Sequence, residues 1–157
     1  MSQNDKPKVV IYSDGGSKPN PGPGGWAAVM IFGAHQKELS GAEDDTTNNR
    51  MELTAAIEAL EALNQPCSVT IHTDSTYLKD GITRWLKGWQ KNNWRTYANK
   101  TVKNEDLWRR LQEAVERHDV KWKWIKGHAG DKWNEHVDQL ATQARNALLK
   151  KIGDNSS

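Results

Sequence analysis

The sequence predicts an α/β fold in which a five-stranded mixed sheet is flanked by helices. Three short strand-like segments follow one another near the start of the chain, which is typical of antiparallel hairpins. Helical and strand-like segments then alternate, which is typical of a strand–helix–strand crossover. The chain has 157 residues, enough for one domain with a substantial core. We therefore expect a single domain over residues 1–157, with its core at about 8–150 and flexible ends.

The first three strands are expected at residues 9–13, 26–32 and 36–41, where mostly apolar or alternating residues are bounded by turn formers. The last two are separated by a turn at Gly33. Between the first two strands, residues 15–25 are dominated by glycine and proline. This composition predicts a long turn that is neither helix nor regular strand.

The first helix is expected at residues 47–63, where Thr46 or Thr47 can cap its start. Its spacing places one set of apolar side chains on a single face, namely Leu53, Ile57 and Leu60. Glutamates at other positions are expected to face outward, namely Glu52, Glu58 and Glu61. The remaining expected elements are a strand at 68–73, a helix at 75–90 with a kink at Gly81 or Gly88, a helix at 104–117, a strand at 120–125 and a helix at 134–152.

Composition excludes several classes of protein. The sequence has no 18-residue apolar run and no secretion or lipidation signal, so we expect a soluble, cytoplasmic protein without a membrane partner. The single cysteine, Cys67, excludes an internal disulfide and fits a reducing compartment. The formal net charge is only +2, but its distribution is uneven, as the basic segment described below shows.

Four carboxylates stand where an apolar run stops or a helix begins. Asp14 and Asp74 follow predicted strands, and Glu52 and Asp138 lie early in predicted helices. Each has an ordinary structural explanation on its own, as a turn aspartate, a helix cap or a surface acid. Together, in an α/β fold that brings them to one end of a sheet, they favour a shared site for hard divalent cations and an enzyme that acts on phosphates.

The sequence excludes two other kinds of site, a phosphate-binding loop and a zinc site. The glycines at 22–25 precede a strand and lack the Gly-Lys-Ser/Thr ending of a phosphate-binding loop. For zinc, His128 and His136 are too far apart for one helical face, and Cys67 has no thiol partner nearby. His128 lies in a predicted loop before the Asp138 helix. It is either an exposed loop residue or, beside clustered carboxylates, a proton relay.

A basic, aromatic segment runs from residue 84 to residue 103 without a single acid. Its cations are Arg84, Lys87, Lys91, Arg95, Lys100 and Lys103, and its aromatic residues are Trp85, Trp89, Trp94 and Tyr97. The tryptophans can be core residues, and we expect burial of Trp85 and of the later Trp108. The alternative is a surface for a nucleic-acid backbone and its exposed bases.

Asparagines stand beside two of the acids. Asn48 and Asn49 open the first helix, and Asn20 lies in the Pro/Gly loop after Asp14. They can form a plain polar helix start and turn. An asparagine amide both donates and accepts hydrogen bonds, however, which also suits recognition of a ribose 2′-hydroxyl.

The ordered set of these motifs resembles the bacterial type 1 ribonuclease H family. The matching strings run from about residue 8 to 150 and are Ser-Asp-Gly-Gly at 13–16, Asn-Pro-Gly-Pro-Gly-Gly at 20–25, Thr-Asn-Asn-Arg-Met-Glu-Leu at 47–53, Thr-Asp-Ser at 73–75, Lys-Gly-His at 126–128, and Asn-Glu at 134–135 with Asp138. Each string alone is modestly specific, whereas the ordered set is highly specific. The resemblance implies a ribonuclease H-like fold. It also implies an endonuclease that cleaves the RNA strand of RNA–DNA hybrids and leaves 5′-phosphate and 3′-hydroxyl ends.

The resemblance also implies roles for individual residues. Two Mg²⁺ ions, for which Mn²⁺ can substitute, would be held by Asp14, Glu52, Asp74 and Asp138. His128 would aid proton transfer or product release. The 2′-hydroxyls of the RNA would be recognised by Asn20, Asn48 and Asn49. A DNA phosphate would be gripped by Thr47 and Asn104, and the basic segment around Trp85 would contact the DNA strand. The expected partner is the hybrid duplex, bound by a monomer.

Two single positions and one loop depart from the family pattern. Asp45 stands where relatives carry an arginine beside the phosphate grip, Gly16 replaces a small hydroxyl residue or alanine, and residues 131–133 differ in the loop after His128.

Two rival functions are weighed against the nuclease. A non-catalytic hybrid- or single-strand-binding protein gains nothing from four acids that face phosphates. A resolvase or transposase core does not explain the pair Asn48 and Asn49.

Overall fold

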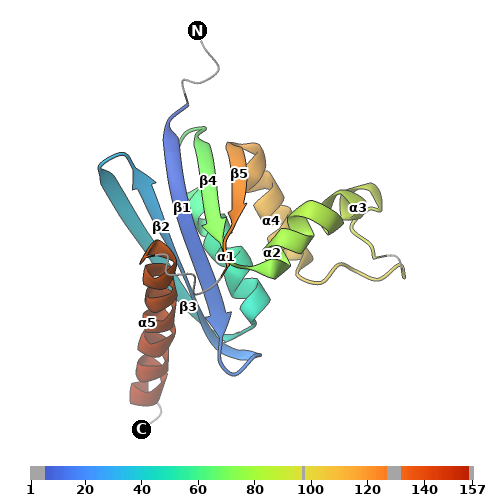
Figure 1. Cartoon of the computed structure of the whole chain (residues 1–157). Coiled ribbons are helices and arrows are strands. Elements are labelled where there is room, and N and C mark those ends of the chain that lie inside the picture. The colour runs from blue at the N-terminus through green and yellow to red at the C-terminus, as the bar shows by residue number, and fades with distance from the viewer. Residues whose placement is uncertain (1–5, 97, 127–131, 156–157) are drawn as a thin grey trace.

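The structure, a computed structural model, describes residues 6–96, 98–126 and 132–155. Within them, five strands form one sheet in the order β3-β2-β1-β4-β5 (Figure 1). The pairs β1–β2 and β2–β3 are antiparallel, whereas β4 is parallel to both β1 and β5. The predicted five-stranded mixed sheet is confirmed. Its strands are β1 (Lys8–Ser17), β2 (Gly22–Phe32), β3 (His35–Thr46), β4 (Ser68–Thr73) and β5 (Asp119–Trp124).

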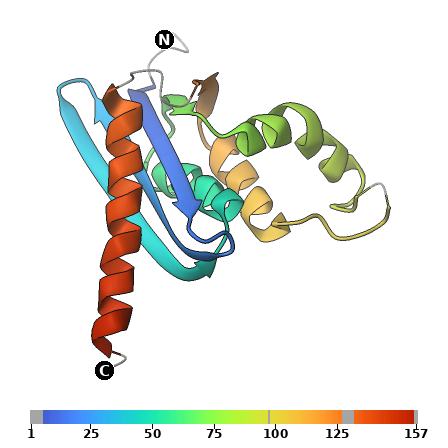
Figure 2. The ribbon, with the colours of Figure 1, turned by 60° about the horizontal axis from the view of Figure 1, so that its bottom comes forward.

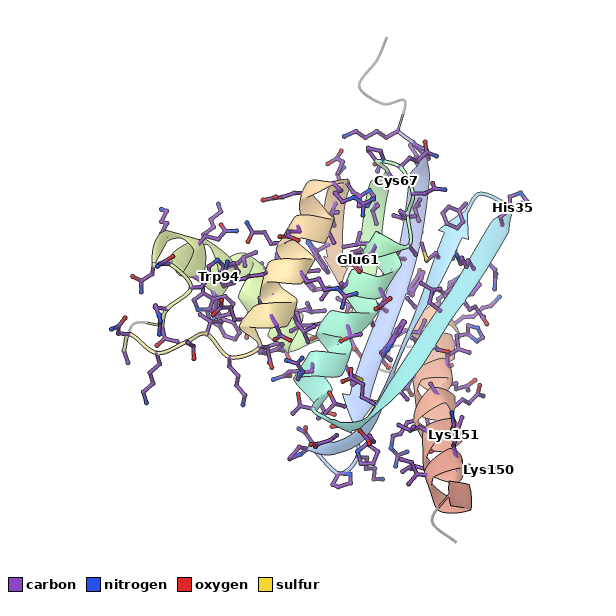
Figure 3. The ribbon with its side chains drawn as sticks, turned by 180° about the vertical axis from the view of Figure 1, so that it is seen from behind. His35, Glu61, Cys67, Trp94, Lys150 and Lys151 are labelled. Atoms are coloured by element: carbon purple, nitrogen blue, oxygen red, sulfur yellow. The ribbon has the colours of Figure 1, made fainter. Side chains whose placement is uncertain are left out.

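Helices cover both faces of the sheet. Seen from behind, α1 and α4 lie side by side over one face (Figure 3), and α5 lies on the opposite face over β1, β2 and β3 (Figure 1). The segment α2–η1–α3 projects away from the sheet (Figure 2). The helical elements are α1 (Asn48–Glu61), α2 (Thr76–Asp80), the π-helical turn η1 (Gly81–Trp85), α3 (Leu86–Lys91), α4 (Glu105–Glu116) and α5 (Lys132–Asn155). Within the described residues, no helix combines the length and apolar character needed to cross a membrane.

The predicted long glycine–proline turn was wrong. β1 continues to Ser17 and β2 begins at Gly22, so only residues 18–21 connect the two strands. The glycines serve close packing rather than a turn. A Cβ on Gly15 would lie 2.5 Å from the carbonyl oxygen of Met51, and a Cβ on Gly25 would lie 2.1 Å from that of Ala141. These glycines let the backbones of α1 and α5 sit directly on the sheet.

The other elements occur where the sequence predicted them, with shifted ends. The predicted kink of the second helix is the π-helical turn that begins at Gly81. A Cβ there would lie 2.0 Å from the ring of Trp108, so the glycine lets this helix approach α4. The last helix begins at Lys132, two residues before the predicted start at Asn134.

The main core lies between the sheet and the helices α1 and α4. Its largest fully buried side chain is Trp108, packed with apolar residues of α1 and of the strands, among them Ile11, Leu53, Ile57 and Ile71. The two helices are also joined at the surface, where Arg110 of α4 contacts Glu58 and Glu61 of α1 at 3.0 and 2.6 Å. Figure 3 labels Glu61 on the face that α1 turns away from the sheet.

His118 is a buried polar residue just before β5. Its Nδ1 accepts a hydrogen bond from the backbone N–H of Cys67 at 3.0 Å, and its Nε2 lies 3.2 Å from the carbonyl oxygen of Leu60. Because Nδ1 is an acceptor and the Leu60 oxygen needs a donor, the ring is neutral with its proton on Nε2. Burial lowers the pKa of His118 below its ordinary value of 6.5.

Replacing His118 by Gln is expected to lower the free energy of unfolding by about 1–3 kcal/mol at pH 7.5, because two buried backbone groups lose a well-placed partner. The folded His118 resists protonation, whereas in the unfolded chain it gains a proton below about pH 6.5. The wild type should therefore lose stability as the pH falls, and its advantage over His118→Gln should narrow. Urea denaturation at pH 7.5, 6.5 and 5.5 measures both effects.

The matched control is His35→Gln, which changes an exposed histidine at the tip of the β2–β3 hairpin (Figure 3). This variant should follow the wild type at every pH. An advantage of the wild type over His118→Gln that stays constant from pH 7.5 to 5.5 would contradict the assignment of a neutral buried ring.

Candidate active site

All four predicted acids line one cavity of about 480 Å³ at the end of the sheet, namely Asp14, Glu52, Asp74 and Asp138. Asp14 is on β1, and Asp74 directly follows β4. These strands are parallel, and Tyr12 of β1 pairs with His72 of β4, so the two aspartates come level with each other. Asp138 reaches the same cavity from α5.

Glu52 does not face outward as predicted. It lies in the first turns of α1, is half-buried and lines the cavity. The missing side chain of Gly15 allows this position, because a Cβ there would also lie 2.9 Å from the backbone nitrogen of Glu52. The Ser75 hydroxyl donates a short hydrogen bond to Oε2 of Glu52, so the start of α2 holds this carboxylate in place.

The electrostatics of the cavity oppose full ionisation of its acids. The pKa of Asp14 is raised from 3.8 to about 8, first by burial and then by the charge of Asp74 and a hydrogen bond with Asp138. The pKa of Glu52 is raised from 4.5 to about 7, mainly by burial, while the Ser75 hydroxyl acts in the opposite direction. Full ionisation of the cluster would therefore place unbalanced negative charge in a partly buried cavity.

The donor chemistry of this cluster fits a divalent cation. Carboxylate oxygens are the ligands that Mg²⁺ prefers, and a cation between them would offset both the burial and the mutual repulsion of the ionised acids. Within the described residues, no three Asp, Glu, His or Cys side chains are grouped closely enough to hold an ion as they lie here. The fit therefore rests on the kind and charge of the donors.

The asparagines beside the cavity are linked to each other and to β1. Oδ1 of Asn48 accepts from the backbone N–H of Ser17 at 2.7 Å, and Oδ1 of Asn20 accepts from that of Asn48 at 3.1 Å. Both carbonyl oxygens are therefore used inside the protein, which leaves the two NH₂ groups to act as donors. Asn48 lines the cavity, whereas Asn49 is half-buried beside it in α1.

Thr47 and Asn104 are joined through Arg50. Thr47 caps α1 and accepts from the Arg50 backbone N–H at 3.2 Å. Asn104 precedes α4 with a left-handed φ of 61°, accepts from Arg50 Nη1 at 3.2 Å and donates to the Tyr77 hydroxyl at 3.0 Å. Arg50 also forms a two-fold contact with Asp106 at 3.0 and 2.8 Å. The sequence placed Arg50 only in a polar helix start and did not predict this linking role.

The basic segment divides into an exposed part and a buried part. The predicted burial of Trp85 was wrong, because this side chain is 37% exposed, whereas Trp108 is fully buried as expected. Trp94 is also buried, and the guanidinium of Arg109 lies 4.6 Å from its ring centre. Trp85 packs edge-on against Tyr77, with 5.9 Å between ring centres. Exposed cations on the same projection are Arg84, Lys87 and Lys91.

Two predicted residues, Tyr97 and His128, lie outside the described residues.

Sequence reasoning missed several residues of the site, among them Ser75 and Arg145. Ser75 was interpreted only as the start of a helix, although its place directly after Asp74 brings its hydroxyl to the Glu52 carboxylate. Arg145 lines the cavity. It stands seven residues after Asp138, a spacing that returns to the same helical face. That periodicity could have revealed it.

The order and directions of the strands, with a carboxylate cavity at the ends of two parallel strands, define the ribonuclease H-like class of α/β proteins. Residues 6–146 match the family model for RNase H, and the chain belongs to this family. It is 60% identical over 141 residues to a ribonuclease H of Hydrogenovibrio crunogenus, covering 90% of this chain and 97% of the relative. It is 58% identical over 149 residues to that of Acidiphilium cryptum, covering 95% and 93%.

Solved structures agree with this assignment. LC9-RNase H1, described as a type 1 RNase H with the type 2 active-site motif, superposes with a TM-score of 0.83 at 32% identity, covering 93% of this chain and 75% of the other. LC11-RNase H1 in complex with an RNA/DNA hybrid has a TM-score of 0.68 at 22% identity, covering 90% and 99%, and shares the fold. The expected bacterial type 1 family is confirmed, and the chain is a nuclease of that family.

Replacing Asp14 by Asn is expected to stabilise the metal-free protein at high pH. The folded chain holds a proton on Asp14 up to about pH 8, whereas the unfolded chain releases it near 3.8. This group therefore costs the folded state more stability as the pH rises through that window. In EDTA, the free energy of unfolding of Asp14→Asn should exceed that of the wild type by about 1–3 kcal/mol at pH 9. The difference should shrink toward pH 5.

Thermal and urea unfolding in EDTA at pH 5, 7 and 9 measure this difference. Asp44→Asn removes an exposed carboxylate outside the cavity and should match the wild type throughout. If Asp14→Asn gains nothing at pH 9, the burial and repulsion that raise the pKa of Asp14 are not present in solution.

Proposed function

We propose that this chain is an endoribonuclease that hydrolyses the RNA strand of RNA–DNA hybrids and leaves 5′-phosphate and 3′-hydroxyl ends. The observation that carries the proposal is the set of four acids around one cavity in a chain of the RNase H family. Support also comes from relatives named ribonuclease H and from LC11-RNase H1, which has the same fold and binds an RNA/DNA hybrid.

The proposed cofactor is a pair of Mg²⁺ ions held by the predicted ligands Asp14, Glu52, Asp74 and Asp138, with Mn²⁺ as a substitute. When bound, such ions supply activation of an attacking water and stabilisation of the departing 3′-oxygen. The protein contributes a fixed, partly desolvated set of carboxylates. Ser75 keeps the Glu52 carboxylate oriented. Because the pKa values of Asp14 and Glu52 are raised, binding of a cation would release protons from these groups and would strengthen as the pH rises. His128 would assist proton transfer or product release.

The RNA strand would be recognised next to the carboxylates by Asn20, Asn48 and Asn49. Because the carbonyl oxygens of Asn20 and Asn48 already accept backbone N–H groups, these two side chains would donate to the 2′-hydroxyl oxygen rather than accept from it. DNA has no such acceptor, which gives a physical basis for selecting the RNA strand.

The DNA strand would lie toward the other side of α1. Thr47 and Asn104 flank Arg50 there, and the projection α2–η1–α3 presents Trp85 and exposed cations. We also propose that the chain acts as a monomer in the cytoplasm, as one catalytic domain over residues 1–157.

Cleavage of a labelled RNA–DNA hybrid tests the proposed activity. The wild type should cleave the RNA strand with Mg²⁺ and not with EDTA. Asp14→Asn should lose about three orders of magnitude in kcat/KM, or roughly 4 kcal/mol of transition-state stabilisation. The control Asp44→Asn should keep wild-type activity. Internal products should accept a 5′ label from a kinase only after phosphatase treatment, as 5′-phosphate ends require.

Two outcomes of this assay would overturn the proposal in different ways. Undiminished cleavage by Asp14→Asn would remove the cavity from the reaction. Hybrid binding by the wild type with no cleavage under any divalent metal would indicate a binding protein instead.

Neutralising the projection should weaken substrate binding more than chemistry. The double variant Lys87→Gln/Lys91→Gln is expected to raise the KM for the hybrid about tenfold at moderate salt, with kcat changed less than twofold. The slope of log affinity against log salt concentration should fall by about two, because two fewer counterions are released on binding. The matched control is Lys150→Gln/Lys151→Gln, which removes two exposed cations at the far end of α5 (Figure 3). Equal KM values and equal salt slopes for the two double variants would argue against a DNA contact at the projection.

A further inference from the structure

The acid-lined cavity has a cationic end. Besides the four carboxylates, its lining includes Lys18, which directly follows β1, and Thr142 and Arg145 on α5. Asn48 lines the same cavity. One continuous space therefore joins a strongly negative region to a positive one.

Arg145 differs from the paired arginines of this protein. Arg50, Arg109 and Arg110 each contact a carboxylate at 2.6–3.0 Å. Arg145 is half-buried but has no carboxylate within ion-pair distance among the described residues. Its Nη1 donates to Asn146 Oδ1 at 2.8 Å and its Nη2 to the Lys18 carbonyl at a long 3.4 Å.

The Nε–H group is a further donor of Arg145, besides those of Nη1 and Nη2. Its Nε atom is buried and has no hydrogen-bond partner among the described residues. A buried donor of a charged group without an acceptor is costly. A guanidinium that offers unused donors in a cavity is suited to a planar, two-point contact with a phosphate or carboxylate.

The position of Arg145 is held by backbone packing. A Cβ on Gly25 would lie 2.9 Å from the Arg145 backbone nitrogen as well as 2.1 Å from the Ala141 oxygen. This turn of α5 therefore rests directly on β2. The base of the Arg145 side chain is fixed by the same contact that fixes α5 beside the carboxylates.

The backbone positions that carry the cationic end are separated from those that carry the acids. Arg145 is seven residues after Asp138, which corresponds to about 10 Å along a helix. Lys18 is four residues after Asp14, which corresponds to about 13 Å along a strand. An anion at Arg145 would therefore be a neighbouring phosphate of the strand whose cleaved phosphate lies at the carboxylates.

We propose that Arg145, with Lys18 beside it, forms an anion site for a non-scissile phosphate of the RNA strand. The proposal rests on the proposed function, because the same cavity must hold that strand. The cleaved phosphate approaches four acids that repel it when no cation is bound. A cationic contact on the next part of the backbone would offset this repulsion and fix the direction in which the strand crosses the site.

Substitution of Arg145 tests the contact. Arg145→Gln is expected to raise the KM for the hybrid at least about tenfold, as loss of a charge-assisted hydrogen bond implies, and to reduce the slope of log affinity against log salt by about one. Arg145→Lys should recover part of the affinity. Lys18→Gln should act in the same direction with a smaller effect. The control Lys150→Gln, on the same helix but outside the cavity, should leave KM unchanged.

A scan of the substrate separates a phosphate contact from a structural role. Hybrids with a single neutral methylphosphonate linkage at successive RNA positions are compared by metal-free binding and by cleavage. One linkage near the cleavage site should weaken wild-type binding about tenfold and have no further effect on Arg145→Gln. Identical scans for the two proteins would overturn the anion site, as would a loss of melting temperature in Arg145→Gln that accounts for its weaker binding.

The measurement of metal-free binding keeps the test of the anion site distinct from the test of the proposed nuclease activity. A wild type that binds the hybrid without cleaving it refutes the nuclease activity, yet its methylphosphonate scan still decides the role of Arg145. A wild type that cleaves normally but gives the same scan as Arg145→Gln refutes the anion site alone.

Discussion

The contact between helix backbones and the glycine-bearing strand ends is the constraint on which the rest of the site depends. Gly15 lets α1 rest on β1, and Gly25 lets α5 rest on β2, with hypothetical Cβ atoms only 2.5 and 2.1 Å from the opposing carbonyl oxygens. Because a side chain at either position would push its helix away, these glycines set the distances between Glu52, Asp138 and the strand acids. The same contacts give the cavity its walls and Arg145 its position.

Bringing acids together in this way has an energetic consequence. Burial and mutual repulsion raise the pKa values of Asp14 and Glu52 to about 8 and about 7. The folded protein thus keeps an unfavourable cluster that a hydrophobic or neutral substitute would relieve, as is common where function requires a strained arrangement. The proposed cation-dependent activity offers a reason for it, because the charge that destabilises the metal-free state is the charge that would bind a metal.

Sequence patterns predicted the elements well and their orientation less well. Apolar runs located β4 and α4 almost to the residue. Glycine and proline after Asp14 were interpreted as a turn, because local composition does not distinguish a glycine that bends the chain from one that admits a neighbouring helix. Glu52 was assigned to the surface for a similar reason. A glutamate in the first turns of a helix has the same local pattern whether it faces water or a cavity built by β1 and α2.

The sequence by itself determined the α/β class, the strand and helix positions, and the residues from which a carboxylate site could be built. It also indicated the family, because the ordered motifs from Asp14 to Asp138 are specific as a set. Only the tertiary structure decided which side chains share a cavity, which tryptophan is exposed, and that Arg145 lines the acid cavity without a carboxylate partner among the described residues. The physical reason is the distance along the chain over which each effect acts. Propensity and periodicity act over a few residues, whereas burial, repulsion and pairing depend on segments far apart in the chain that packing brings together.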